Sequence, residues 1–121
     1  MWESEKKEVL EAAQEMSRRG LAVGTSGNVS IRLTDPGGRD LLAITPNSRY
    51  YDTLTVDEIV VVDFEGQTVE GDLATSIEIM LHIGIYKARN KVNAIIHCHP
   101  VFSSVLAVTG SAIPPLSLIH I

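Results

Sequence analysis

Two histidines one residue apart close an apolar, β-prone segment at residues 95–100. In a strand, alternate side chains leave the same face, so His97 and His99 would point to one side and Cys98 to the other. A catalytic Zn²⁺ takes three protein ligands and keeps one position open, whereas a structural Zn²⁺ takes four ligands. The pair therefore predicts half of a metal site; the alternative is two strand-end histidines, one bonded to the backbone and one exposed.

Glu78 is the nearest candidate for a further ligand. A carboxylate beside a metal completes its coordination shell or moves protons. Thr75 and Glu78 also have the spacing of a capping box, in which Glu78 at N3 would only tie down the start of a helix. Both interpretations stay open. His82 falls four residues later on the same helical face, and we expect it to support the site or to lie in the core.

Three short segments carry small or polar residues suited to an anion. The loop at residues 24–28 can present backbone N–H groups as a nest, although it lacks the Gly-Lys-Ser/Thr ending of a P-loop. The second segment follows Pro46, and the third lies in the first turn of an expected helix, where free N–H groups favour phosphate. Ordinary turns are the alternative. The residues of interest are Gly27, Asn28, Asn47, Ser48 and Ser76.

The elements that must position these residues follow from periodicity and turn chemistry. Helix formers predict an opening helix over residues 2–19. Alternation predicts a strand at 29–33, and the turn at residues 35–38 returns the chain into a strand at 41–45, which gives a hairpin. A second helix is expected from Thr75 to about Arg89. The other expected elements are a capped turn at Thr55–Glu58, strands at 59–63, 68–70 and 94–99, and a helix from Pro100, at N1, to about Val108.

Ile77, Leu81 and Ile85 would lie along one face of the second helix. Helices and strands are mixed without a strict βαβ alternation. This favours a layered α/β domain with a largely antiparallel sheet over a doubly wound parallel one.

Composition limits the class of protein. With 121 residues, 45% of them hydrophobic and 21% charged, the chain 1–121 is expected to form one globular domain. A net charge of −5 without a basic stripe argues against nucleic acid as a partner. No apolar run is long enough to predict a membrane span. The single Cys98 and the lack of a leader predict a reducing, cytoplasmic setting.

Taken in order, these motifs resemble the class II aldolase/adducin N-terminal domain family, over nearly the whole chain to about Pro115. The motifs are Gly27-Asn28-Val29-Ser30, Ile44-Thr45-Pro46, Ser76-x-Glu78 with His82, and His97-x-His99-Pro100. The resemblance implies a three-layer α/β/α domain with a mixed, mostly antiparallel sheet, incomplete at its C-terminus. Within the family the likeness is greatest to sugar-phosphate lyases such as those that act on L-fuculose 1-phosphate.

The resemblance also implies roles for the matching residues. His97 and His99 match two of three zinc-binding histidines, and Glu78 matches the acid that contacts zinc at rest and then acts as acid/base. Zinc, one ion per subunit, would chelate two oxygens of a ketose fragment and stabilise the enediolate while donors orient the phosphate. The phosphate would be held by Gly27 with Asn28, Asn47 with Ser48, and Ser76 with Ile77.

The function implied is that of a zinc-dependent aldolase, homotetrameric at full length, that cleaves a ketose 1-phosphate to dihydroxyacetone phosphate and an aldehyde. The small-molecule sugar phosphate is the expected partner, with no nucleic acid and no membrane. Alternatives are a methylthioribulose-1-phosphate dehydratase-like lyase and a non-catalytic module like the adducin head. Glu78 argues against the epimerase branch, which tends to have Asp at this position.

The chain departs from the family pattern in several places. Ser48 stands where Gly is frequent, and Ile77 replaces a second Ser, which removes one phosphate donor. The third zinc histidine and the proton-transfer tyrosine are expected beyond His99, and His120 does not match the position of that histidine. We therefore expect a C-terminal truncation, residues from about Leu116 that are not native, and very weak or no activity of the 121-residue chain.

Overall fold

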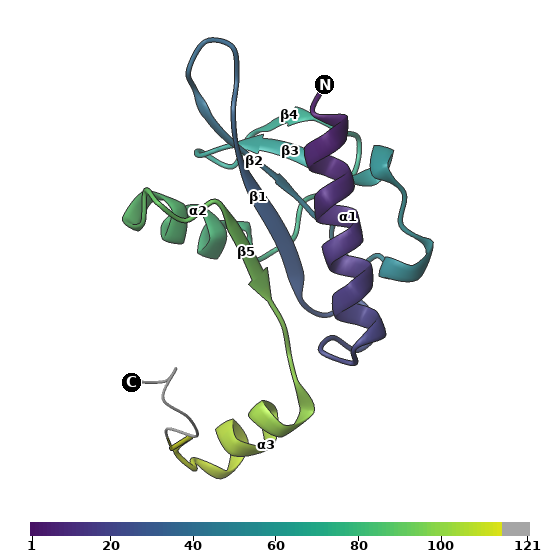
Figure 1. The fold of residues 1–121 in the computed structure, drawn as a ribbon, viewed down its shortest axis with the longest axis vertical. Coiled ribbons are helices and arrows are strands. Elements are labelled where there is room, and N and C mark those ends of the chain that lie inside the picture. The colour runs from purple at the N-terminus through teal and green to yellow at the C-terminus, as the bar shows by residue number, and fades with distance from the viewer. Residues whose placement is uncertain (115–121) are drawn as a thin grey trace.

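The structure, a computed structural model, describes residues 1–114 and arranges them in three layers (Figure 1). A five-stranded sheet of order β4-β3-β2-β1-β5 lies between helix α1 on one face and helix α2 on the other. The helices are α1 (Glu3–Arg18), α2 (Ile79–Ala88) and α3 (Val101–Thr109). The strands are β1 (Asn28–Thr34), β2 (Asp40–Ile44), β3 (Val60–Asp63), β4 (Thr68–Glu70) and β5 (Ala94–His97).

Every pairing between these strands is antiparallel in the described part of the chain. The β1–β2 hairpin sets Ser30 opposite Ile44. On its other edge β1 pairs with β5, which sets Asn28 opposite His97. The expected α/β class, with three layers and a mostly antiparallel sheet, is confirmed. The expectation that residues from about Leu116 are not native concerns residues outside the described range.

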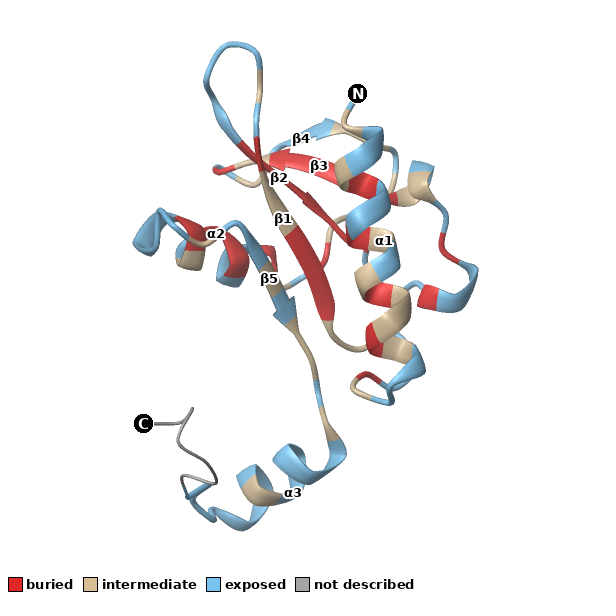
Figure 2. Cartoon of the chain, in the orientation of Figure 1, coloured by how far each residue is buried: buried red, intermediate tan, exposed pale blue. Residues whose placement is uncertain are grey.

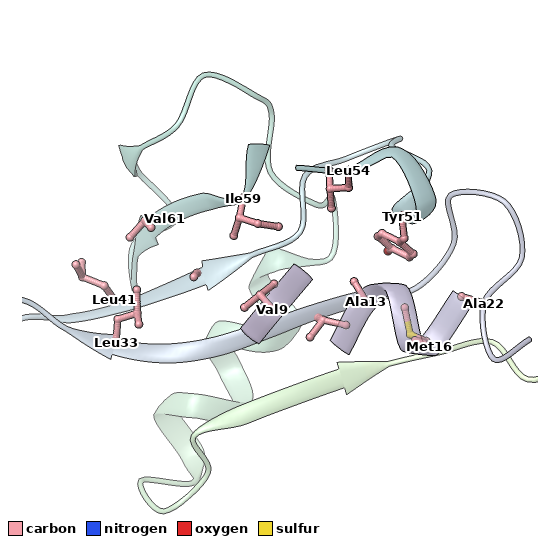
Figure 3. Close-up of a cluster of buried hydrophobic side chains, with 12 residues drawn as sticks. Val9, Ala13, Met16, Ala22, Leu33, Leu41, Tyr51, Leu54, Ile59 and Val61 are labelled. Carbon is pink, nitrogen blue, oxygen red and sulfur yellow. The ribbon is translucent and has the colours of Figure 1, made fainter. Parts of the chain in front are cut away.

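Alternation along the central strands divides the core into two clusters. Leu41 and Ala43 of β2 pack on the α1 side, whereas Leu42 and Ile44 pack on the α2 side. Figure 2 shows this buried centre running through β1, β2 and β3. The α1-side cluster, drawn in Figure 3, includes Val9, Ala13 and Met16 of α1. The α2-side cluster includes Ile79, Ile83 and Tyr86 of α2.

The start and the buried face of α2 differ from the prediction. The helix begins at Ile79, and Glu78 is its N-cap residue without a side-chain cap bond. Thr75 instead forms an isolated antiparallel bridge with Pro46. This pairing holds the segment before α2 out of the helix, so the predicted capping box at Thr75 does not form. The capped turn at Thr55–Glu58 does form, with the Thr55 N–H donating to Glu58 Oε2 at 2.9 Å.

The apolar residues predicted to share one face of α2 do not form its buried face. Ile77 precedes the helix and is 84% exposed, and Leu81 is 49% exposed. The buried face of α2 instead combines two apolar residues, Ile79 and Ile83, with two residues that carry polar groups, His82 and Tyr86. Polar side chains on this face need hydrogen-bond partners inside the protein.

Helix α3 follows β5 and lies apart from the sheet (Figure 1). Pro100 is its N-cap residue rather than N1, and none of its residues is buried. Val101, Phe102 and Val108 are 57%, 85% and 88% exposed. Within residues 1–114, no helix has both the length and the apolar character needed to cross a membrane.

Candidate metal centre and anion cleft

Three potential metal ligands converge where β5 ends beside the start of α2. One ligand atom from each of Glu78, His97 and His99 lies within 4.8 Å of the other two. The His97 and His99 rings have centroids 4.8 Å apart. Cys98, between them, packs against the α1-side cluster, so its side chain takes the opposite direction.

The Nδ1 atom of His97 indicates that this cluster suits a cation. It is 3.0 Å from Glu78 Oε2. The atom is nevertheless buried and has no hydrogen-bond partner in the described part of the chain, because the contact does not have hydrogen-bond geometry. A buried nitrogen without a partner, next to a carboxylate oxygen, calls for an explanation. A divalent ion held by His97 and Glu78 would satisfy both groups, since imidazole and carboxylate are donors that zinc accepts.

Asn28 orients the carboxylate of this cluster. Its side-chain Nδ2 donates to Glu78 Oε2 at 2.6 Å and to Ser76 Oγ at 3.1 Å. Its Oδ1 contacts Nε2 of His82. Asn28 is therefore buried with its whole amide engaged, and the side chain predicted for phosphate binding also positions the predicted acid/base.

A glycine permits β1 and β5 to meet at this point. Gly27 has a φ of +76°, and a Cβ atom there would lie 2.7 Å from the carbonyl oxygen of His97. Its own carbonyl accepts a hydrogen bond from the Tyr51 hydroxyl. Farther along, the His99 N–H donates to the Leu21 carbonyl at 2.9 Å. These contacts fix the two histidines against the loop that precedes β1.

A cleft of about 320 Å³ opens beside the metal ligands. The Pro46–Thr75 bridge and a hydrogen bond from the Asn47 N–H to the Ala74 carbonyl, 2.9 Å long, hold two of its walls together. The predicted site residues in its lining are Gly27, Asn28, Asn47, Ser48, Ser76, Ile77, Glu78 and His99. His97 lies next to the cleft through its contact with Glu78.

Away from Glu78 and His99, the polar groups that line the cleft are uncharged. Ser76 Oγ accepts from Asn28 Nδ2 and, at 3.3 Å, from the Glu78 N–H, which leaves its own proton available to a ligand. Ser48 has a φ of 55°, a left-handed conformation that explains why glycine suits this position. No lysine or arginine belongs to the lining within residues 1–114.

Sequence reasoning missed several residues around the site. Thr25 and Ser26 also line the cleft. Neither was named as a site residue, although both belong to the loop at residues 24–28 that was predicted to bind an anion. Ser30 and Tyr86 were not singled out either, although both make buried hydrogen bonds near the site. The signal for Ser30 was its place two residues after Asn28 in an alternating strand, on the same face of the sheet.

His82 has the supporting place that its spacing suggested. It is fully buried on α2, with Nε2 against Asn28 Oδ1 and Nδ1 2.6 Å from Ser30 Oγ. Burial, and secondarily the neighbouring His97, lowers the pKa of His82 to about 4, while Glu78 opposes this shift. The ring is therefore neutral at pH 7, and both of its nitrogens are used inside the protein.

The curated relatives of this chain include sugar-phosphate enzymes. A 5-methylthioribulose-1-phosphate/5-deoxyribulose-1-phosphate aldolase of Escherichia coli O45:K1 (strain S88 / ExPEC) is 40% identical over 110 residues, which are 91% of this chain and 49% of that protein. An L-ribulose-5-phosphate 4-epimerase of Salmonella paratyphi C (strain RKS4594) is 34% identical, over 95% of this chain and 49% of that protein. The chain thus spans about half the length of the curated relatives it matches.

Solved structures and a family comparison agree with these relatives. An L-fuculose 1-phosphate aldolase structure superposes with a TM-score of 0.79 at 32% identity, covering 89% of this chain and 50% of that one. Residues 7–121 match the family described as Class II Aldolase and Adducin N-terminal domain. This chain therefore belongs to the class II aldolase and adducin N-terminal domain family.

Proposed function

We propose that the chain provides the metal-binding and phosphate-binding part of a zinc-dependent aldolase. The reaction is the reversible cleavage of a ketose 1-phosphate, such as L-fuculose 1-phosphate, to dihydroxyacetone phosphate and an aldehyde. The observation that carries this proposal is the convergence of Glu78, His97 and His99 within 4.8 Å, next to a polar cleft. Class II aldolase membership supports the reaction type.

The ligand set determines what the centre can do. When bound, a divalent ion supplies Lewis-acid chemistry, polarising substrate oxygens and stabilising the negative charge that develops as the carbon–carbon bond breaks. His97 and His99 hold the ion, and Glu78 is both a ligand at rest and the group that accepts or returns a proton. Asn28 keeps Glu78 Oε2 directed toward His97.

The cleft orients the substrate. We assign the phosphate to the three neighbouring segments that contain Gly27, Asn47 with Ser48, and Ser76. The Ser76 hydroxyl is a free donor there, and backbone N–H groups at the start of α2 add a favourable dipole. Ile77 adds no donor. With its phosphate fixed at this end of the cleft, the sugar is directed toward the metal ligands at the other end. Such positioning lowers the activation barrier of the cleavage.

The choice of sugar is tested with a small panel. L-fuculose 1-phosphate is included because it is the substrate named for the structural neighbour. The other two compounds, 5-deoxyribulose 1-phosphate and 5-methylthioribulose 1-phosphate, are named for the Escherichia coli relative. Retention of the two histidines and Glu78 argues against a non-catalytic module. A methylthioribulose-1-phosphate dehydratase is distinguished by loss of water without release of an aldehyde.

The decisive experiment measures metal content and product together. Because the relatives are about twice as long, the assay uses both the 121-residue chain and the longest natural reading frame that contains it. We expect bound zinc in both proteins, and metal-dependent release of dihydroxyacetone phosphate that is strong in the longer protein and weak in the short one. No bound metal and no product from any panel member in either protein would reject the proposal.

Assembly and location complete the proposal. We assign a homotetramer to the full-length enzyme and a cytoplasmic location, in which Cys98 stays reduced. Analytical ultracentrifugation of the longer protein tests the first assignment, since a monomer at micromolar concentration contradicts it. Fractionation of the source cells tests the second.

A further inference from the structure

A continuous line of buried hydrogen bonds connects the metal centre to the interior of the domain. It interleaves residues from β1 and α2. The Tyr86 hydroxyl is 2.8 Å from Ser30 Oγ, which is 2.6 Å from His82 Nδ1. His82 Nε2 contacts Asn28 Oδ1, and Asn28 Nδ2 donates to Glu78 Oε2 at 2.6 Å. Apart from Glu78, each of these residues is at most 2% exposed.

The Glu78 carboxylate at one end sets the direction of every bond in this line. A carboxylate only accepts, so Asn28 must direct its NH₂ group toward Glu78 and its carbonyl oxygen toward His82. His82 therefore carries its proton on Nε2 and accepts at Nδ1. Ser30 gives its proton to Nδ1 and receives one from the Tyr86 hydroxyl. All donors point toward the metal centre, and bonds aligned in this way reinforce one another.

We propose that His82 is a positioning residue for this centre, whose neutral Nε2–H tautomer, with Nδ1 accepting from Ser30, holds Asn28 so that its NH₂ group faces Glu78. This inference rests on the proposed function. Without the His82 donor, the Asn28 carbonyl oxygen loses its contact on the α2 side, and only Glu78 and Ser76 favour the observed orientation of the amide. The reversed amide would place Oδ1 against the carboxylate, which repels it and withdraws Glu78 from the place where it faces His97.

The first test compares two substitutions of one residue in the 121-residue chain. His82→Gln keeps an N–H near the position of Nε2, whereas His82→Leu removes it. We expect Co²⁺ affinity, measured by its absorption bands, to fall at least about tenfold in His82→Leu, because supporting residues of metal ligands have effects of this size. In His82→Gln the loss should stay below about threefold, a rescue by the conservative variant that a purely structural role would not produce.

A matched control separates packing from positioning. Ile83 is adjacent to His82 on α2 and is 1% exposed, and its hydrocarbon side chain takes no part in these hydrogen bonds. Ile83→Val should lower stability and leave Co²⁺ affinity unchanged. If His82→Leu retains the wild-type circular dichroism spectrum and wild-type Co²⁺ affinity, the proposal is overturned.

A second measurement needs neither a variant nor a metal. Nitrogen-15 shifts of the His82 ring in the metal-free wild-type protein report which nitrogen carries the proton. The Nε2–H tautomer at pH 7 supports the proposal even where His82→Leu does not fold, and an Nδ1–H tautomer or an imidazolium overturns it. Failure of the wild-type chain to bind Co²⁺ or Zn²⁺ counts against the proposed function instead, so the two failures are distinguishable.

Discussion

Asn28 places both ends of its side-chain amide in internal contacts, with Glu78 and Ser76 on one side and His82 on the other. A phosphate must therefore compete with these contacts if it is to use this side chain. The phosphate-binding role of Asn28 stays a prediction, whereas its contact with Glu78 is part of the structure. At the scale of single residues, the orientation of the Glu78 carboxylate depends on the Asn28 amide, which the sequence motifs alone associate with the substrate phosphate.

Glu78→Gln tests the acid/base role most directly. Glutamine keeps an oxygen that can accept from Asn28 but cannot take up the proton that the reaction moves. We expect kcat of the full-length protein in the proposed aldolase reaction to fall about 10²- to 10⁴-fold, the range for loss of a general acid or base, with the thermal midpoint little changed. Steady-state kinetics with the best panel substrate measures this. A variant with wild-type kcat would remove Glu78 from the mechanism.

His82 predicts a dependence of stability on pH. Its pKa is about 4 in the folded protein, below the ordinary value of 6.5, so the unfolded chain binds more protons between these values. Its contribution to stability is complete above pH 6.5 and is lost as the pH falls toward 4. The slope from this single group reaches at most about 1.4 kcal/mol per pH unit. Urea unfolding at several pH values, with His82→Gln as the comparison, checks this; an unchanged slope in the variant contradicts it.

At the scale of elements, the β1–β5 junction depends on the absence of a side chain at Gly27. Gly24 provides a matched control, because its φ of +64° is also left-handed but a Cβ there would meet nothing within 4 Å. We expect Gly24→Ala to cost about 1 kcal/mol for the backbone conformation alone. Gly27→Ala should cost about 2–4 kcal/mol, because the clash with the His97 carbonyl adds to that cost.

The comparison is made by urea unfolding, and metal affinity is measured on the same samples. Gly27→Ala should also weaken Co²⁺ binding, since relief of the clash moves the end of β5. Equal destabilisation by the two substitutions would show that the close approach at Gly27 has no energetic consequence.

The elements were predictable where local patterns and tertiary structure agree. The alternation in β1, the turn that leads from it into β2 and the capped turn at Thr55 follow from neighbouring residues, so the sequence indicates them. The start of α2 was not predictable, because Thr75 pairs with Pro46, far away in the chain, and this pairing overrides a good local capping signal. The residue types of the site were visible as motifs. The Ser30–His82–Tyr86 contacts were not, because they depend on β1 and α2 meeting.

At the scale of the whole molecule, metal binding should be linked to folding. The ligands come from two separate segments, so an ion that binds only the folded chain stabilises it. At a free metal concentration of 100 times Kd the gain is about 2.7 kcal/mol. We expect thermal unfolding in EDTA at a lower temperature than with added Zn²⁺, and no such difference in a His97→Ala/His99→Ala variant. Identical midpoints in the wild type would argue against a specific site.

Helix α3 carries apolar side chains that the described residues leave uncovered. Phe102 is 85% exposed. Phe102→Lys should change stability by no more than about 0.5 kcal/mol, as exposed positions usually do. It should also reduce self-association of the 121-residue chain, because large uncovered apolar areas promote aggregation. Urea unfolding and light scattering at matched concentration test both effects, and a clear loss of stability would mean that Phe102 packs in solution.

Alternation in β1 has a consequence for how sequences of this kind can vary. Asn28 and Ser30 face α2 and its polar groups, whereas Val29 and Leu33 belong to the α1-side cluster. Inserting or deleting a single residue within the strand would exchange the two sets, and would place an amide and a hydroxyl among hydrocarbon while valine faced the acid. We therefore expect β1 to tolerate substitutions but no insertion or deletion of a residue. Insertions and deletions should be confined to the loop between β1 and β2.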